Sequence, residues 1–340
     1  MKWVLLLIIG FPLSLAFAND RVLNVYNWSN FMPHQVIQAF EKETGIRVHY
    51  AEFDGNDTLY TKLKADPHSD FDVIVPSSYY VDRMRRESML RPIDKNYLPN
   101  LKYINPLLLN RSFDPHNQYS IPYLWGTTGI VVNDQYFNPR QLRTWRDLWN
   151  KRYKNQLLML DDAREVFAIA LLSLGYSIND RNPQHITQAY HQLRALMPNI
   201  KLFNADAEGS IYIDEDVNVG IGWSGDIYVA RQENKHLHYL YPKPTFPIWI
   251  DCLAIPKYAP HYQNAMIFLN FLMRPTIAKQ ITLAKGYSSP NWAAIRLLPK
   301  NLQRDLLLNP SNELLKRGEV EADLGPSDAV YEKYWELLKL

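Results

Sequence analysis

Short apolar segments alternate with amphipathic segments along this 340-residue chain, and this alternation restricts the fold more than any other feature. In the first part of the chain, the segments with the composition of strands are residues 22–28, 46–53 and 71–78, and those with a helical pattern are residues 33–44, 58–65 and 79–90. Strands that alternate with helices predict a parallel sheet covered by helices on both faces. The chain is long enough for two such domains.

The same pattern returns in the second half of the chain. Residues 155–176 and 217–232 each read as a strand, a polar turn and a helix, and residues 262–287 as helices with Pro275 beginning the second. In open α/β sheets, ligands bind at the carboxyl ends of the strands. Several polar or aromatic residues end predicted strands, namely Trp28, Ser77, Ser78, Asp162 and Trp223. We therefore expect a binding site at these strand ends.

The N-terminus has the features of a secretory signal peptide. Lys2 precedes an apolar stretch, and the sequence Ala16-Phe17-Ala18 has the small residues of a cleavage site. A membrane anchor is the alternative, but the apolar stretch is short for a membrane span. We predict that residues 1–18 are removed and that the mature protein begins at Asn19. Cys252 is the only cysteine, which excludes a disulfide within the chain.

Charge and motifs argue against several classes of function. The net charge is only +2, too small to indicate a nucleic acid or a membrane surface as partner. The chain has no G-x-S-x-G, H-E-x-x-H or P-loop motif, so we predict no enzyme, no cofactor and no metal site. Asp162 and Glu165 remain as a possible acid pair of a hydrolase. Arg164 lies between them in sequence, and ion pairing is the simpler explanation of this cluster.

Residues 246–256, FPIWIDCLAIP, read as a strand with a single charge. Side chains alternate between the two faces of a strand, so Asp251 shares a face with Trp249, and Cys252 lies on the other face. A buried carboxylate without a partner is costly. Asp251 is either a structural residue bonded to loop amides or an arginine, or one wall of a site for an organic cation. This strand alone leaves both interpretations open.

Longer motifs identify a resemblance to a known family. They are YNWSNFMP, KETGI, FDVIVPSSYYVDRM, SIPYLWGTTGIVVN, DDAREVF, LMPN, WIDCLAIP, NFLMRP and GYSSPN. With them the chain resembles the periplasmic spermidine/putrescine-binding proteins of polyamine ABC transporters. The resemblance runs from about residue 22 to the C-terminus and is nearly colinear.

The resemblance implies the fold of a type II periplasmic binding protein, in which two α/β lobes enclose a ligand cleft and are joined by hinge crossover strands. The crossovers fall near residues 125–130 and 249–253. Lobe 1 then comprises residues 19–127 and 252–295, and lobe 2 residues 128–251 and 296–340. The implied protein is a periplasmic monomer that binds a polyamine and docks to a membrane permease.

The resemblance also implies which residues form the site. Aromatic rings enclose the methylene groups of the polyamine in this family, and the matching residues are Trp28, Tyr79, Trp223, Trp249 and Tyr287. Carboxylates hold the amino groups, and the matching residues are Asp162, Glu165 and Asp251. Small polar residues also line the site, and they match Ser29 and Ser77.

The sequence departs from its relatives at positions that affect selectivity. Relatives carry an acid where this chain has Asn30 and a tyrosine where it has Phe31. Asp226 is typical of putrescine-selective relatives, and Glu321 stands where spermidine-type relatives have glutamine. All these positions are predicted to contact the ligand, but the preference between spermidine and putrescine stays open. Another organic cation as ligand, such as a basic amino acid, and a polyamine sensor remain alternatives.

Overall fold

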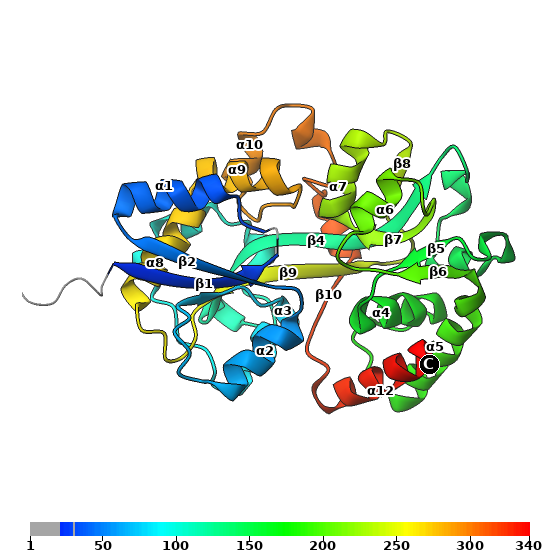
Figure 1. Cartoon of the computed structure of the whole chain (residues 1–340), viewed down its shortest axis with the longest axis horizontal. Helices are drawn as coiled ribbons and strands as arrows, with labels where there is room; N and C mark the ends of the chain where they lie inside the picture. The colour runs from blue at the N-terminus through cyan, green and yellow to red at the C-terminus, as the bar shows by residue number, and fades with distance from the viewer. Residues whose placement is uncertain (1–20, 30) are drawn as a thin grey trace, which may run out of the picture.

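The computed structural model describes residues 21–29 and 31–340 of the chain. The predicted signal peptide and Asn30 lie outside the described residues. Two lobes lie side by side and are joined by long central strands (Figure 1). Within the described part of the chain, no helix has the length and apolar character needed to cross a membrane.

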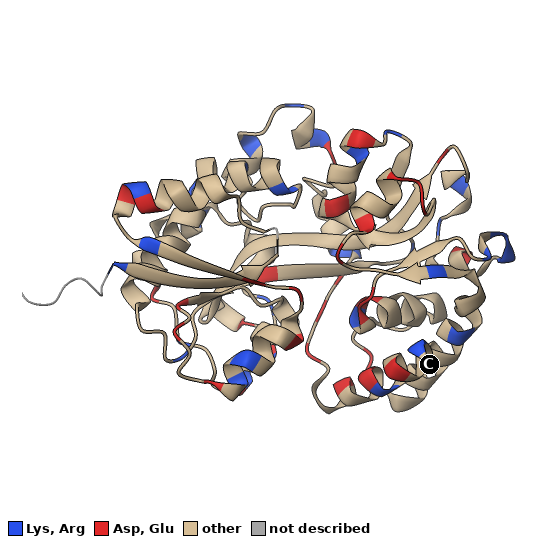
Figure 2. Cartoon of the chain, in the orientation of Figure 1, with Lys and Arg blue, Asp and Glu red and all other residues tan. Residues whose placement is uncertain are grey.

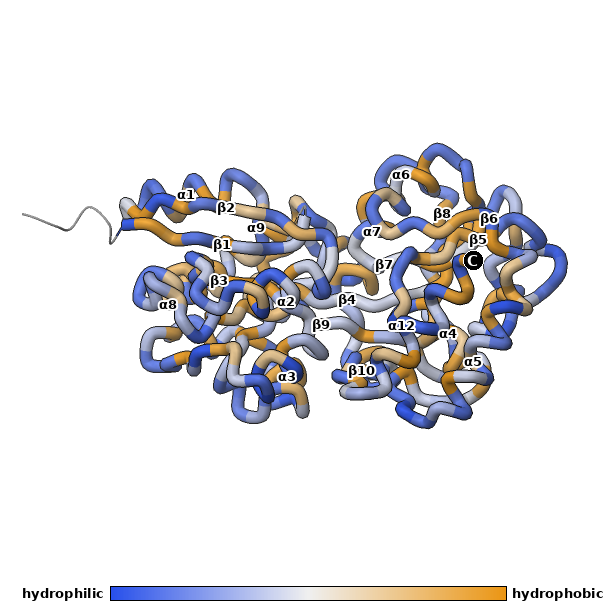
Figure 3. The backbone as a smooth tube through the Cα atoms, turned by 60° about the horizontal axis from the view of Figure 1, so that its bottom comes forward, coloured by the Kyte–Doolittle hydropathy of each residue, from blue (hydrophilic) through white to orange (hydrophobic). Residues whose placement is uncertain are grey.

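Two antiparallel strands connect the lobes. β4 (Ser120–Asn133) is buried along its whole length, and it pairs with β9 (Pro247–Ala254) from Ser120 opposite Ala254 to Thr127 opposite Ile248. Both strands run from one lobe into the other (Figures 1 and 3). These are the predicted crossover strands near residues 125–130 and 249–253, and β4 is longer than the sequence indicated.

Lobe 1 is built on the parallel strands that precede the first crossover. β1 (Val22–Trp28) pairs in parallel with β2 (Arg47–Phe53) and with β3 (Val73–Ile74), and β3 adjoins β9. The helices of this lobe are α1 (His34–Thr44), α2 (Asn56–Ala65), α3 (Ser78–Arg86), α8 (Tyr262–Leu272), α9 (Pro275–Lys285) and α10 (Trp292–Arg296). They lie on both sides of the sheet (Figure 1).

Lobe 2 repeats the arrangement on the other side of the crossover. Its parallel strands are β7 (Val219–Trp223), β5 (Leu157–Met159) and β6 (Ile200–Phe203), and β8 (Leu237–Leu240) pairs with β4. Its helices are α4 (Ala163–Leu174), α5 (Pro183–Leu196), α6 (Glu208–Ile213), α7 (Ser224–Glu233) and α12 (Asp328–Lys339). The predicted fold class is confirmed, whereas the exact lobe boundaries stay a prediction.

The C-terminal chain returns to the crossover before it ends. After α11 (Asn312–Arg317), β10 (Glu319–Val320) pairs in parallel with β9. Residues 319–327, which we call the strap, then contact both lobes. From lobe 1, Arg83 Nη2 donates to Asp323 Oδ1 (2.9 Å), and from lobe 2, Arg164 Nη2 donates to the Ala322 carbonyl (3.2 Å).

The predicted alternation along β9 is confirmed by the way its two faces pack. Trp249 and Leu253 belong to the hydrophobic cluster that contains Phe40 and Phe268 of lobe 1. Ile248, Ile250 and Cys252 belong to a different and larger cluster. β9 is therefore covered on both faces, and Asp251 is a carboxylate in a buried strand, with 3% of its surface exposed.

Candidate ligand-binding site

A pocket of about 600 Å³ lies between the lobes. Every site residue predicted from the sequence that the structure describes lines this one pocket. They are Trp28, Ser29, Phe31, Ser77, Tyr79, Asp162, Glu165, Trp223, Asp226, Trp249, Asp251, Tyr287 and Glu321. Asn30, the remaining predicted residue, is outside the described residues. The residues come from both lobes, from β9 and from the strap, so the pocket depends on how these parts are held together.

Asp251 is fixed by a chain of hydrogen bonds from lobe 1. Ser77 Oγ donates to Asp251 Oδ1 (2.6 Å), and Asn56 Nδ2 donates to Ser77 Oγ (3.0 Å). Burial raises the pKa of Asp251 to about 7, although the Ser77 hydroxyl acts in the opposite direction. The serine occupies only one carboxylate oxygen. A cation in the pocket would supply the opposite charge that this buried group lacks.

Glu165, at the start of α4, has one satisfied oxygen and one unsatisfied oxygen. Its Oε1 accepts hydrogen bonds from Thr128 Oγ1 and from Trp223 Nε1, both at 2.8 Å. Its Oε2 is buried and has no hydrogen-bond partner among the described residues. Burial and the nearby Asp162 carboxylate raise the pKa of Glu165 to about 7. An unpaired buried carboxylate oxygen in a pocket is a binding position for an ammonium group.

Two further acids stand close to Glu165. Asp162 caps α4, because its Oδ1 accepts from the Glu165 amide (3.0 Å). Glu321 is carried by the strap and is 4% exposed. Burial raises the pKa of Glu321 well above its usual range, and the carboxylates of Glu165, Asp162 and Asp251 act in the same direction. Like charges this close favour protonation of some members in the absence of a cation.

Arg164 does not form the ion pairs that the sequence suggested. Its Nη2 donates to Asn179 Oδ1 (3.1 Å) and to the Ala322 carbonyl, and its guanidinium lies 5.5 Å from the centre of the Tyr79 ring. Asp162 caps the helix and Glu165 lies three residues further on, so both line the pocket, whereas Arg164 is directed toward Asn179 and the strap. Among the described residues no direct ion pair joins Arg164 to these acids, although its positive charge lowers the pKa of Asp162, Glu165 and Glu321 and so partly offsets the effect of burial.

Aromatic rings form the walls of the pocket. Tyr287 packs against Trp249 with ring centres 5.5 Å apart and against Phe31 at 4.9 Å, and Phe31 is 6.0 Å from Trp28. The indole nitrogens of Trp28 and Trp249 are buried and have no hydrogen-bond partner among the described residues. Rings next to carboxylates suit a ligand that has both methylene groups and ammonium groups.

Sequence reasoning missed several residues of the pocket. Asn56 donates to both Ser77 Oγ and the Tyr79 hydroxyl (3.1 Å), but nothing in its local sequence marks it as a site residue. The acids of α6, α7 and the preceding loop were also missed, namely Asp206, Glu208 and Glu233. Figure 2 shows that acidic residues recur on the inner ends of the elements where the two lobes face each other.

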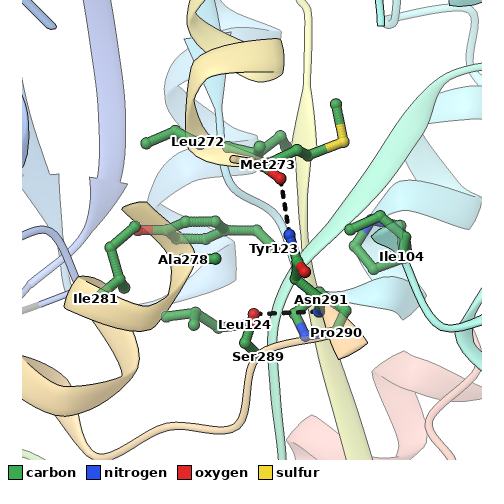
Figure 4. Close-up of a pocket in the computed structure, with 12 residues that line it drawn as sticks. Ile104, Tyr123, Leu124, Leu272, Met273, Ala278, Ile281, Ser289, Pro290 and Asn291 are labelled. Carbon is green, nitrogen blue, oxygen red and sulfur yellow. Dashed lines mark hydrogen bonds between the residues drawn. The ribbon is translucent and has the colours of Figure 1, made fainter. Parts of the chain in front are cut away.

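A second cavity lies within lobe 1, between β4, α9 and the segment before α10 (Figure 4). It is lined mainly by apolar side chains, and Asn291 closes one side by donating to the Met273 carbonyl (2.7 Å). Its volume is about 10 Å³, room for a single water at most. It is a packing defect rather than a ligand site. In the described ranges 21–29 and 31–340, no group of His, Cys, Asp and Glu is arranged to hold a metal ion.

The raised pKa values predict that the ligand-free protein loses stability as the pH rises. The usual pKa values of Asp251 and Glu165 are 3.8 and 4.5, and in the folded chain both are raised to about 7. The folded state therefore keeps protons that the unfolded chain releases, so this stability is lost as the pH rises from about 4.5 through 7. We expect a difference of about 1–2 kcal/mol for each group between pH 5.5 and pH 8.

Thermal unfolding without ligand should accordingly give a Tm several degrees lower at pH 8 than at pH 5.5. The matched control is Asp251→Asn, which cannot titrate and should reduce this difference. A Tm that rises steadily from pH 5.5 to pH 8 in the wild type would contradict the assignment of these two carboxyl groups as protonated.

Comparison with known proteins places the chain among solute-binding proteins. The profile of the family of bacterial extracellular solute-binding proteins matches residues 35–308. The spermidine/putrescine-binding periplasmic protein of Escherichia coli (strain K12) is 44% identical over 328 residues, which cover 96% of this chain and 94% of that protein. A putrescine-binding periplasmic protein of Pseudomonas aeruginosa is 32% identical, with 88% of this chain and 86% of the relative covered. The solved structure of a putative spermidine/putrescine ABC transporter from Listeria monocytogenes has a TM-score of 0.89 and 37% identity, and the match covers 94% of this chain and 99% of that one.

Proposed function

The chain belongs to the family of bacterial extracellular solute-binding proteins, and from this premise we propose that it binds a linear polyamine in the periplasm and delivers it to the membrane permease of an ABC transporter. The observation that carries the proposal is the unpaired Glu165 Oε2 in a pocket walled by tryptophan and tyrosine rings. Such a pocket complements ammonium groups that are separated by methylene chains.

The free energy available from these contacts is sufficient for tight binding. A hydrogen bond to a charged group contributes about 1.5–3 kcal/mol, and a cation over a desolvated aromatic ring about 0.5–2 kcal/mol. A Kd of about 1 μM requires only about 8 kcal/mol in total. Three or more carboxylate contacts, which the acids lining the pocket can provide, together with the rings supply interaction free energy of this size.

The alternative that the chain is a hydrolase has less support from the geometry. Asp162 is used as a helix cap, and Glu165 Oε1 is held by Trp223 and Thr128. One oxygen of each carboxylate thus already accepts hydrogen bonds from the protein, and such fixed carboxylates are better suited to binding a ligand than to transferring protons. We propose that the protein is not an enzyme and that it acts as a monomer.

Calorimetry and thermal unfolding with putrescine, cadaverine, spermidine, spermine and arginine test the proposal. We expect at least one polyamine to bind with a Kd in the micromolar range or below. At a ligand concentration of 100–1,000 times Kd, the stabilisation is about 2.7–4.1 kcal/mol, which raises the Tm by several degrees. Tighter binding of arginine than of every polyamine would favour a different cation as the ligand, and consumption of the polyamine would favour a hydrolase.

A further inference from the structure

The strap carries Glu321 into the pocket, although its pairing with the sheet ends just before this residue. β10 consists of Glu319 and Val320 only, and residues 321–324 have no regular secondary structure on the way to α12 (Figure 1). Glu321 nevertheless lines the pocket and is 4% exposed. Contacts other than a regular strand ladder must therefore hold this carboxylate in place.

All four polar groups of the two peptide units that flank the Glu321 Cα are hydrogen-bonded. Two of these bonds come from β9 and α3, because the Glu321 amide donates to the Ile248 carbonyl (3.0 Å) and Ser78 Oγ donates to the Glu321 carbonyl (3.0 Å). The other two bonds come from Asn179. Since peptide units are planar, fixing both units fixes φ and ψ of Glu321, and with them the direction of its Cα–Cβ bond.

Asn179 lies in the connection between α4 and α5 and uses both ends of its amide. Its Nδ2 donates to the Val320 carbonyl (3.0 Å), and its Oδ1 accepts from the Ala322 amide (2.8 Å). A residue of a neighbouring parallel strand would bond the same two groups, so the Asn179 side chain takes the place of such a strand beside Glu321. An amide both donates and accepts, which neither an ionised aspartate nor a leucine of similar size can do.

Arg164 orients the Asn179 side chain. Its Nη2 donates to Asn179 Oδ1 (3.1 Å) and to the Ala322 carbonyl (3.2 Å), and Arg164 is itself 7% exposed. Arg164 precedes Glu165 in α4, so the same contacts join the strap to the helix that carries the Glu165 carboxylate. Asn179 is not among the described residues that line the pocket. Its contacts therefore act on the position of Glu321 and not on the ligand directly.

On the basis of the proposed polyamine binding, we propose that Asn179 is a positioning residue for the ligand. It holds the backbone on both sides of Glu321 and so keeps this carboxylate directed into the pocket before the ligand arrives. Without the Asn179 side chain, the Val320 carbonyl and the Ala322 amide lose their partner, and the strap gains freedom at the residue that carries the carboxylate. The ligand must then order Glu321 as it binds, which costs affinity.

A double-mutant cycle tests this role by titration calorimetry, with whichever of spermidine and putrescine binds the wild type more tightly. Asn179→Ala should raise the Kd about 3- to 10-fold, the cost of immobilising one side chain on binding. Glu321→Ala should raise the Kd about 10- to 100-fold, as for the loss of a charged hydrogen-bond partner. In the Glu321→Ala background, Asn179→Ala should change the Kd less than about twofold, because no carboxylate is left to position.

Two further variants complete the test. Ser327→Ala removes another hydrogen bond between the strap and lobe 2, from Ser327 Oγ to the Arg181 carbonyl (3.2 Å), and should leave the Kd within about twofold of the wild type. Ser78→Ala removes the bond from lobe 1 to the Glu321 carbonyl and should raise the Kd about threefold, again only where Glu321 is present. This second variant keeps the test valid if Asn179→Ala does not fold.

The cycle distinguishes positioning from a purely structural role, which would also lower the Tm of Asn179→Ala. A purely structural role predicts that Asn179→Ala raises the Kd equally in the wild type and in the Glu321→Ala background. An equal rise in both backgrounds, or no rise in either, would therefore overturn the positioning role, and so would a Glu321→Ala variant that binds as tightly as the wild type. Absence of polyamine binding by the wild type would instead overturn the proposed function, and the positioning role with it.

Discussion

Replacing Asp251 with asparagine should weaken polyamine binding by about 2–5 kcal/mol, a rise in Kd of about 30- to 5,000-fold. The carboxylate is 3% exposed and lines the pocket, with one oxygen held by Ser77. Removing its charge would leave a ligand ammonium buried without its counter-ion. Titration calorimetry of the variant at pH 8, where the wild-type carboxylate is mostly ionised, measures the full effect.

A matched variant separates charge from orientation at the same place. Ser77→Ala removes the hydroxyl that fixes Asp251 but leaves its charge, and should cost about 1 kcal/mol of binding. Asp251→Asn should also fold, with a Tm near pH 6 no lower than that of the wild type, because asparagine has the shape of the protonated acid and its folding requires no uptake of a proton. A Kd for Asp251→Asn within twofold of the wild type would mean that the aspartate is structural.

Alanine at the two pocket tryptophans should separate binding from folding. Trp223→Ala should weaken binding by at least about 2 kcal/mol, because it removes a pocket wall and the donor to Glu165 Oε1. Trp249→Ala should lower the free energy of unfolding by about 3–5 kcal/mol as well as weaken binding. Trp249 is only 7% exposed and belongs to the lobe 1 core, whereas Trp223 is partly exposed.

The variant Trp223→Phe controls for the role of the indole nitrogen. Phenylalanine keeps an aromatic wall and loses the hydrogen bond to Glu165 (2.8 Å), so an intermediate loss of affinity is expected. Chemical denaturation and calorimetry on the same three variants give both quantities. If Trp249→Ala is as stable as the wild type, its ring does not support the core.

The strand faces and strand ends of the site could be predicted from sequence because they follow from local periodicity. Asp251 and Trp249 share a face of β9 as the alternation requires, and Trp28 and Trp223 end β1 and β7. The residues of the site come from distant parts of the chain, and the resemblance to a family was needed to group them. Their role as ligand contacts stays a prediction.

Other features depend on tertiary contacts that no local pattern encodes. The segment 71–78 was predicted as one strand, but β3 comprises only Val73–Ile74. Pro76 has no amide hydrogen, and the Ser77 amide donates to the side chain of Asn56 (3.0 Å) rather than to a neighbouring strand. Glu208 was missed for a similar reason, because nothing in its local sequence marks it as buried and it is 2% exposed where α6 packs against α7.

The strap has a mechanical consequence for how a ligand is captured. The strap is a third segment, beside β4 and β9, that contacts both lobes. It pairs with β9 and has hydrogen bonds to Ser78 of lobe 1 and to Arg164 of lobe 2. Three segments that connect the lobes side by side form a hinge, so a rotation of one lobe relative to the other at this crossover is the expected movement.

Under such a rotation, displacement grows with distance from the axis. Asp251 and Glu321, which lie on or next to it, would keep nearly the same separation in open and closed forms. Pocket residues that lie farther from the axis on either lobe would move further. The residues near the axis would thus bind the first ammonium group in both the open and the closed form. The residues farther from the axis would contact the ligand only after closure and would determine its rate of dissociation.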